Sequence, residues 1–267
     1  MHLDVVELKA FYYRTTLGRW VQAQMQRELR GLWPNVRDMR VEGFGFTAPF
    51  LRPFLADTSD VLSLMPAEQG VIPWPANDPN RSLLVEETEW PLESSSIDRL
   101  LVAHGLETCE RPAALLEEMY RVSAPQGRVV LIVPNRLGSW ARRDATPFGY
   151  GRPYSFGQLD KQLRIHGFDP VAHRGALYAP PHYSNRSLRL AGSVERMARG
   201  LNPQRFAGVL IVEAQKRLYP PPQRIKERKR STLEVLGGLA APVPTGPAGI
   251  RGFSPTGPDF GNSKRNG

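Results

Sequence analysis

A chain of 267 residues, 41% of them hydrophobic, is long enough for one domain with additions and a sizeable core. The formal net charge is +9, and residues 220–267 hold eight Lys or Arg against three acids, so +5 of it lies in the tail. The single cysteine, Cys109, excludes an internal disulfide and a cysteine-rich metal site, and we expect no metal. Acids at Asp4 and Glu7, and the lack of any apolar run of about 18 residues, favour a cytoplasmic protein without a membrane span.

Residues 1–35 are predicted to be a helical extension, because apolar residues recur there at helical spacing. The apolar stripe comprises Leu17, Val21, Met25, Leu29 and Leu32. Three arginines, Arg19, Arg27 and Arg30, lie off this stripe. The helix therefore packs on a sheet or covers a pocket, or else presents a basic face to nucleic acid. Interspersed acids weigh against nucleic acid.

A glycine-rich segment follows the first predicted strand, residues 37–42, and precedes a helix predicted over residues 49–56. It reads Gly43-Phe44-Gly45-Phe46-Thr47. A glycine turn between a strand and a helix lets a ligand approach the backbone, and the helix N-terminus adds a partial positive charge. Gly43, Gly45 and Thr47 are therefore candidate ligand-binding residues.

The clearest structural unit spans residues 90–136. Residues 97–103 form an apolar run of strand length, residues 112–122 have apolar positions at helical spacing, and residues 129–133 form a second apolar strand. Apolar strands without alternation are typical of a parallel sheet covered on both faces. Before this unit, residues 60–65 and 81–85 are predicted to be strands two and three.

The elements after this unit predict an antiparallel end to the sheet. A helix is expected over residues 155–166, a strand over 168–179, a helix over 187–201 and a last strand within 206–216. Residues 36–219 would then form one domain. Residues 220–267 are rich in Gly and Pro, include a basic cluster at 224–230, and are predicted to be a disordered tail.

Two segments at the carboxyl ends of predicted strands carry candidate site residues, because ligands of open α/β sheets bind at that edge. His104 directly follows the fourth strand and could act as a base or border a ligand, although a purely structural histidine is equally supported. Residues 135–155 combine cations and aromatic rings, which favour an anionic acceptor or, alternatively, a surface lid with solvated arginines. The candidate acceptor-binding residues are Arg142, Arg143, Tyr150, Arg152 and Tyr154.

Three short motifs in residues 86–134 resemble those of class I S-adenosylmethionine-dependent methyltransferases, in the branch that includes ubiquinone and menaquinone biosynthesis enzymes. They are Trp90-Pro91-Leu92, Ser96-Ile97-Asp98, and Arg121-Val122-Ser123-Ala124-Pro125-Gln126-Gly127. The family has a Leu-Pro-Phe-like turn, Ser-Phe-Asp before strand four, and a helix ending Arg-Val-Leu-Lys-Pro-Gly-Gly. The resemblance implies a Rossmann-like, doubly wound α/β fold with a mostly parallel seven-stranded sheet of order 3-2-1-4-5-7-6.

The resemblance also implies a cofactor site. In the family an Asp-x-Gly-x-Gly-x-Gly loop holds the methionine part of S-adenosylmethionine. Gly43 and Gly45 match this loop, whereas Val41 and Thr47 replace its acid and its third glycine. The family acid that binds the ribose at the end of strand two is replaced by Met65, and Glu68 is a nearby substitute.

Two further positions have family counterparts. Glu86 stands where the family acid contacts the adenine amino group, and its alternative is a solvated surface acid. His104 would border the adenosine half of the cofactor. Glu107 stands where many relatives carry a histidine.

These observations predict an S-adenosylmethionine-dependent methyltransferase acting on a small, anionic molecule. The missing acids at Val41 and Met65 keep open an inactive protein of the same fold with a regulatory or partner-binding role. An RNA-modifying or RNA-binding protein is the third alternative, supported only by the arginines and the basic tail.

Overall fold

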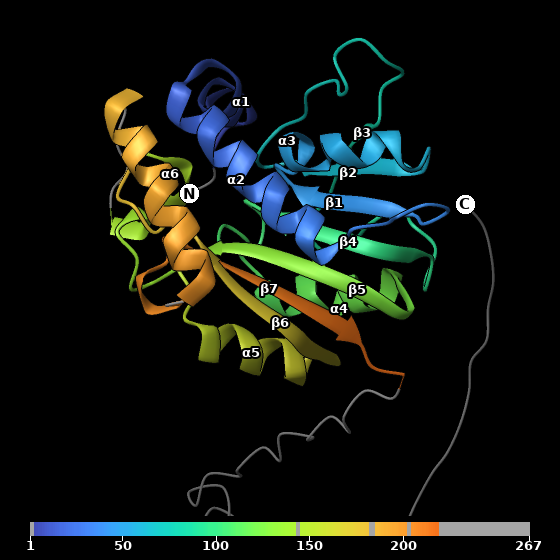
Figure 1. Cartoon of the computed structure of the whole chain (residues 1–267). Coiled ribbons are helices and arrows are strands. Elements are labelled where there is room, and N and C mark those ends of the chain that lie inside the picture. The colour runs from blue at the N-terminus through green and yellow to red at the C-terminus, as the bar shows by residue number, and fades with distance from the viewer. Residues whose placement is uncertain (1–2, 143–144, 182–184, 202–203, 219–267) are drawn as a thin grey trace, which may run out of the picture. The chain divides into compact units, whose positions relative to one another are not determined.

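Residues 3–142, 145–181, 185–201 and 204–218 are described by this computed structural model, and they form one seven-stranded sheet between two layers of helices (Figure 1). The strands are β1 Val41–Gly45, β2 Val61–Pro66, β3 Ser82–Val85, β4 Ile97–Ala103, β5 Ser123–Pro134, β6 Phe168–Ala176 and β7 Val209–Lys216. Their order is β3-β2-β1-β4-β5-β7-β6. Neighbours are parallel from β3 to β5, whereas β7 is antiparallel to both β5 and β6. The predicted fold class and strand order are confirmed.

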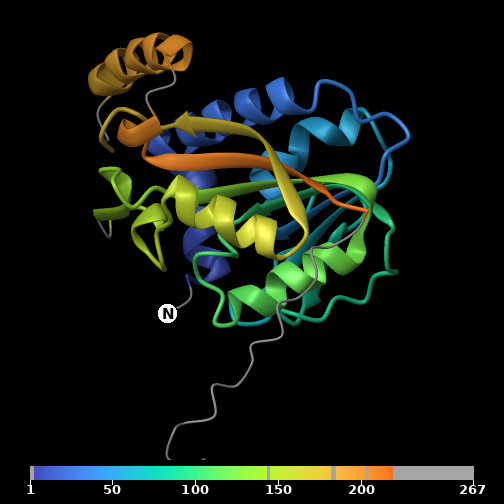
Figure 2. The ribbon, with the colours of Figure 1, turned by 90° about the horizontal axis from the view of Figure 1, so that it is seen from below.

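Helices cover both faces of the sheet, which explains the uninterrupted apolar strands. The helices are α1 Val5–Arg14, α2 Thr16–Leu32, α3 Ala48–Leu51, α4 Pro112–Val122, α5 Phe156–Ile165 and α6 Asn185–Leu201. One core layer joins α1, α2, α3 and α6 to strand residues such as Leu101, and the other joins α4 and α5 to residues such as Leu100. Figure 2 shows α2 and α6 on one side of the sheet, and α4 and α5 on the other.

The first strand begins later than the sequence pattern predicts. Asp38 has a positive φ of 58°, a backbone conformation that cannot continue a strand, so β1 starts at Val41 instead of residue 37. Gly43 and Gly45 consequently lie inside β1, and pair with Ser63 of β2 and Ala103 of β4. They are strand residues rather than members of a turn after the strand.

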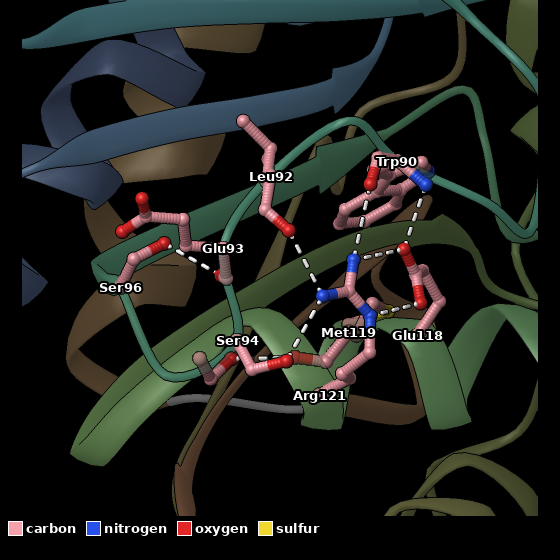
Figure 3. A network of polar contacts seen from close by, with 9 residues as sticks. Trp90, Leu92, Glu93, Ser94, Ser96, Glu118, Met119 and Arg121 are labelled. Atoms are coloured by element: carbon pink, nitrogen blue, oxygen red, sulfur yellow. Dashed lines mark hydrogen bonds and ion pairs between the residues drawn. The ribbon is translucent and has the colours of Figure 1, made fainter.

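Arg121, at the end of α4, holds the segment that leads into β4 (Figure 3). Its guanidinium donates to the carbonyl oxygens of Trp90 at 3.0 Å and Leu92 at 2.9 Å, and to the carboxylate of Glu118 at 2.7 and 2.8 Å. The same carboxylate accepts the Trp90 backbone N–H at 2.7 Å. The motif residues that carry the family resemblance thus bind one another and shape the scaffold.

Several expectations concern residues outside the described ranges. Arg143 and residues 219–267, which include the tail predicted to be disordered, belong to this group. No helix within the described ranges is long and apolar enough to span a membrane. Those ranges also contain no group of three or more His, Cys, Asp or Glu side chains placed to hold a metal.

Candidate functional site

The site lies where the carboxyl ends of β1, β2 and β4 meet helix α1. Strand order reverses between β1 and β4, and open α/β sheets bind their ligands at such a switch point. The backbone N–H of Val5, at the start of α1, donates to the carbonyl oxygen of Gln69 after β2 at 2.8 Å. Tyr12, near the end of α1, contacts His104 after β4. The N-terminal helix therefore lies across this edge of the sheet.

The side chains of Tyr12 and His104 form a buried hydrogen bond. The Tyr12 hydroxyl lies 2.6 Å from Nε2 of His104. Burial, and next the carboxylate of Glu107, raise the pKa of Tyr12 well above its usual value, so the phenol keeps its proton. In the tautomer with the ring proton on Nδ1, which faces Glu107, Nε2 of His104 accepts the hydrogen bond from the Tyr12 hydroxyl. The aromatic rings of Phe46, Phe50 and Phe148 surround the pair.

Glu107 completes this cluster from the turn after β4. Its Oε1 lies 3.4 Å from Nδ1 of His104, and the residue is only 1% exposed. Neither carboxylate oxygen accepts a hydrogen bond from any residue within the described ranges. The backbone N–H of Arg152 donates to the Glu107 carbonyl at 2.7 Å, which brings the loop after β5 against this turn. Burial, followed by the carboxylate of Glu107, raises the pKa of Tyr154 to about 12.

Gln69 adds a second buried polar group beside His104. Its Nε2 donates to the carbonyl oxygen of His104 at 2.8 Å, whereas its Oε1 has no partner among the residues that the structure describes. The neighbouring Glu68, the substitute considered for the ribose-binding acid, is exposed. The tight turn after β2 therefore directs Gln69, and not Glu68, toward the edge of the sheet. Met65 is fully buried in the core.

Gly43 and Gly45, the glycines predicted to hold the cofactor, are also required by packing, because neither position has room for a Cβ atom. A Cβ on Gly43 would lie 2.1 Å from Oγ1 of Thr47, whose buried side chain fills that space. Gly45 has a φ of +85°, and a Cβ there would lie 2.3 Å from the carbonyl oxygen of Ala103. The structure thus brings Gly45 beside the backbone of His104, while the side chain of Thr47 covers Gly43.

Glu86 follows β3, which lies on the far side of β2 and β1 from β4, and its side chain is exposed. The next residue, Glu87, is buried instead and accepts hydrogen bonds from the thiol of Cys109 at 3.4 Å and the backbone of Glu110 at 3.2 Å. The structure does not bring Glu86 into contact with His104.

The predicted acceptor residues divide between the surface and the core. Arg142 is exposed, and Tyr150 packs partly buried against the core. Arg152 lines a surface pocket of about 310 Å³ together with Arg136, Tyr154 and Lys161. Arg142 and Arg152 therefore face outward, away from the buried Tyr12–His104–Glu107 cluster. A larger pocket of about 550 Å³ lies at the opposite edge of the sheet, beside Asp38 and Asp98, where parallel strands begin.

The sequence comparison and the fold comparison both find methyltransferases. Residues 48–131 match the model of a methyltransferase domain, and no curated protein matches the chain in sequence. A Thermotoga maritima structure, described as an S-adenosylmethionine-dependent methyltransferase and possible histamine N-methyltransferase, has a TM-score of 0.51 at 15% identity, covering 75% of this chain and 92% of its own. An S-adenosylmethionine-dependent methyltransferase from Archaeoglobus fulgidus has a TM-score of 0.53 at 16% identity, covering 80% and 100%. The matched domain and the strand order show that the chain has the fold of the class I S-adenosylmethionine-dependent methyltransferases.

Proposed function

We propose that this protein transfers a methyl group from S-adenosylmethionine to a small-molecule acceptor. The observation that carries the proposal is the buried cluster of Tyr12, His104 and Glu107 at the carboxyl end of β4, beside the switch in strand order. A scaffold-only role does not require a carboxylate that is buried without hydrogen bonds, because such a group costs folding free energy.

The residues along this edge fit the proposed methyl donor. Oε1 of Gln69, which has no partner among the described residues, can accept a hydrogen bond from a ribose hydroxyl. In the family, an acid at the position of Met65 has this role. The end of β1, from Gly45 to Thr47, and the backbone at His104 border the same place. Glu86 remains the proposed contact of the adenine amino group, and its exposed side chain would lie at the outer end of the site. The bound donor would supply an electrophilic methyl group on a sulfonium.

Methyl transfer needs little beyond alignment of the acceptor with that methyl group and removal of a proton. His104 is the proposed base, because its Nε2 already accepts a hydrogen bond from the Tyr12 hydroxyl. The reacting group of the acceptor would take the place of that hydroxyl, which requires Tyr12 to withdraw. Since Tyr12 belongs to α1, an acceptor reaches His104 only when the Tyr12 side chain rotates away or this helix shifts.

The anionic character expected of the acceptor remains part of the proposal. Its support is the surface pocket lined by Arg136, Arg152 and Lys161, because three cations in one pocket favour a carboxylate or phosphate. Tyr154 lines this pocket. The carboxylate of Glu107 raises the pKa of Tyr154 and the cation of Arg152 lowers it, so Tyr154 lies near both the buried cluster and the pocket. The acidic group would then lie at the outer end of the acceptor.

Calorimetric titration with S-adenosylmethionine and S-adenosylhomocysteine tests the function. We expect both ligands to bind the wild-type protein. Gly45→Asp should weaken both by tenfold or more, about 1.4 kcal/mol, because a side chain there meets the Ala103 carbonyl and the backbone has positive φ. Gly157→Asp is the control, because a Cβ at Gly157 meets no atom within 4 Å. Binding that survives Gly45→Asp would place the site elsewhere.

An inactive protein with a regulatory or partner-binding role is the second candidate. Val41 and Met65 favour it, because neither can supply the hydrogen bonds of the family acids and both are buried in the core. Failure of both adenosyl ligands to bind at about millimolar concentration would select it. The RNA reading gains no support from Arg30, which pairs with Asp57 and lies over the Phe54 ring.

A further inference from the structure

We infer that the reacting group of the acceptor is an amine, and that its N–H groups bind the carboxylate of Glu107. The inference rests on the proposed methyl transfer and concerns the same site. It adds the chemical class of the group that is methylated, which is separate from any anionic group at the outer end of the acceptor.

The first argument is the unused hydrogen-bonding capacity of Glu107. An ionised carboxylate has two acceptor oxygens, and proteins seldom bury one without donors. Glu107 is 1% exposed, and nothing in the described part of the chain donates to either oxygen within hydrogen-bond geometry. Nδ1 of His104 lies 3.4 Å from Oε1 of Glu107, without forming a hydrogen bond to it. A ligand that supplies two N–H groups would satisfy both oxygens.

The second argument is the character of the surroundings. The rings of Tyr12 and Phe148 pack against His104, Phe46 stacks on Tyr12, and the faces of aromatic rings attract cations. Arg152 binds Glu107 through its backbone, but its side chain lines the surface pocket instead. A negative charge in an aromatic enclosure favours an ammonium or amine and repels a carboxylate or phosphate.

Glu107 and His104 can also handle the charge and the proton that methylation of an amine produces. Methylation of a neutral amine forms one N–C bond and breaks one C–S bond, whose electron pair stays on sulfur. The nitrogen becomes positively charged and then loses one proton. Glu107 stabilises the developing charge, and Nε2 of His104, once free of Tyr12, accepts the proton.

Three probes of the same shape test this assignment: benzylamine, benzyl alcohol and benzoate. Their binding is measured by ligand-observed NMR at neutral pH with no adenosyl ligand, on the wild-type chain and on Tyr12→Ala, which removes the ring that covers His104. We expect benzylamine to bind at least about tenfold more tightly than either other probe, most clearly to Tyr12→Ala. Equal binding of all three, or tighter binding of benzoate, would overturn the inference.

A pair of matched substitutions then locates the bound amine. In the Tyr12→Ala background, Glu107→Gln should weaken benzylamine by about tenfold or more and leave benzyl alcohol within about twofold. Glu110→Gln, an identical change at an exposed position three residues along, should affect neither probe. Loss of benzylamine binding from Glu110→Gln, or its persistence in Glu107→Gln, would place the amine elsewhere.

Titration of the same proteins with S-adenosylhomocysteine separates the two proposals. If the adenosyl ligand binds but benzylamine binds neither wild type nor Tyr12→Ala, the amine assignment is wrong and methyl transfer stands. If benzylamine binds through Glu107 and no adenosyl ligand binds, the amine site stands and methyl transfer fails.

Discussion

The hydroxyl of Tyr12 lies 2.6 Å from Nε2 of His104, across 92 positions of sequence. This bond joins the N-terminal helix to the end of the central strand β4, at the edge where the family places its chemistry. The proposed base and the residue bonded to it therefore come from distant parts of the sequence. Helix α1 packs directly on the candidate site.

Tyr12→Phe should destabilise the protein by about 1–3 kcal/mol, because it leaves Nε2 of His104 buried without a donor. Urea unfolding monitored by circular dichroism measures the change. Tyr13→Phe, one residue along and only partly buried, is the control and should stay within about 0.5 kcal/mol of wild type. An equal effect of the two substitutions would mean that the bond to His104 contributes nothing.

Glu107→Gln should raise the stability of the protein by about 1 kcal/mol, while it weakens amine binding by about tenfold or more. The neutral amide removes a buried charge that has no hydrogen bond among the described residues. Thermal unfolding gives the comparison, with Glu110→Gln as the exposed control. A melting temperature lowered by several degrees would show that the carboxylate is paired and needed by the fold.

The strand order was predictable from the resemblance to the methyltransferase family, whereas β4 and the second half of β5 were recognisable as apolar runs of strand length. The start of β1 was not, because the turn at Asp38 depends on a single backbone torsion within a polar stretch. His104 was found because it directly follows an apolar strand. Tyr12 was missed, because Phe11-Tyr12-Tyr13 gives no local sign that one hydroxyl reaches a residue far along the chain.

The buried hydrogen-bond acceptors Gln69 and Glu107 show a second limit of prediction from sequence. Glu68 and Gln69 are adjacent, and only the fold of the turn after β2 decides that Gln69 faces inward. Glu107 could be noted as an unusual residue at its position, but its lack of hydrogen bonds is visible only in three dimensions. Arg152, chosen for its charge, instead faces a surface pocket.

Glu42 should make the stability of the protein depend on pH. Burial raises the pKa of its carboxyl from 4.5 to about 7, against the opposing effect of Arg40, 2.7 Å away. Because the folded pKa is the higher one, the stabilising contribution of the protonated form is complete below about pH 4.5 and is lost as the pH rises through 7. The loss amounts to roughly 3 kcal/mol.

Glu42→Gln tests this dependence, because the amide does not titrate. We expect the free energy of unfolding of the variant, relative to wild type, to rise by roughly 3 kcal/mol from pH 4.5 to pH 7.5. Urea unfolding at pH 4.5, 6 and 7.5 measures this difference. Glu110→Gln, at an exposed position, should show no such gain. A constant difference between Glu42→Gln and wild type would mean that Arg40 keeps the carboxylate ionised throughout.

Arg121→Ala should destabilise the protein by about 2 kcal/mol or more, because Glu118 and the carbonyls of Trp90 and Leu92 lose their shared donor (Figure 3). Arg164→Ala is the control: Arg164 also pairs with an acid on its own helix, but it is more exposed and should cost less than about 1 kcal/mol. Urea unfolding compares the two. Similar losses would show that the network around Arg121 contributes no more than a surface ion pair.

Gln69 should decide how well the site binds the adenosyl ligand. Gln69→Ala removes the buried Oε1 and should weaken S-adenosylhomocysteine by about tenfold or more in calorimetric titration, whereas Glu68→Ala, at an exposed position, should not. Because Gln69→Ala also removes the donor to the His104 carbonyl, Gln69→Glu separates the two roles. It keeps the acceptor oxygens and loses the donor, so it should retain binding while lowering the melting temperature. Loss of binding in Gln69→Glu would mean that Gln69 acts by positioning His104 and does not contact the ligand.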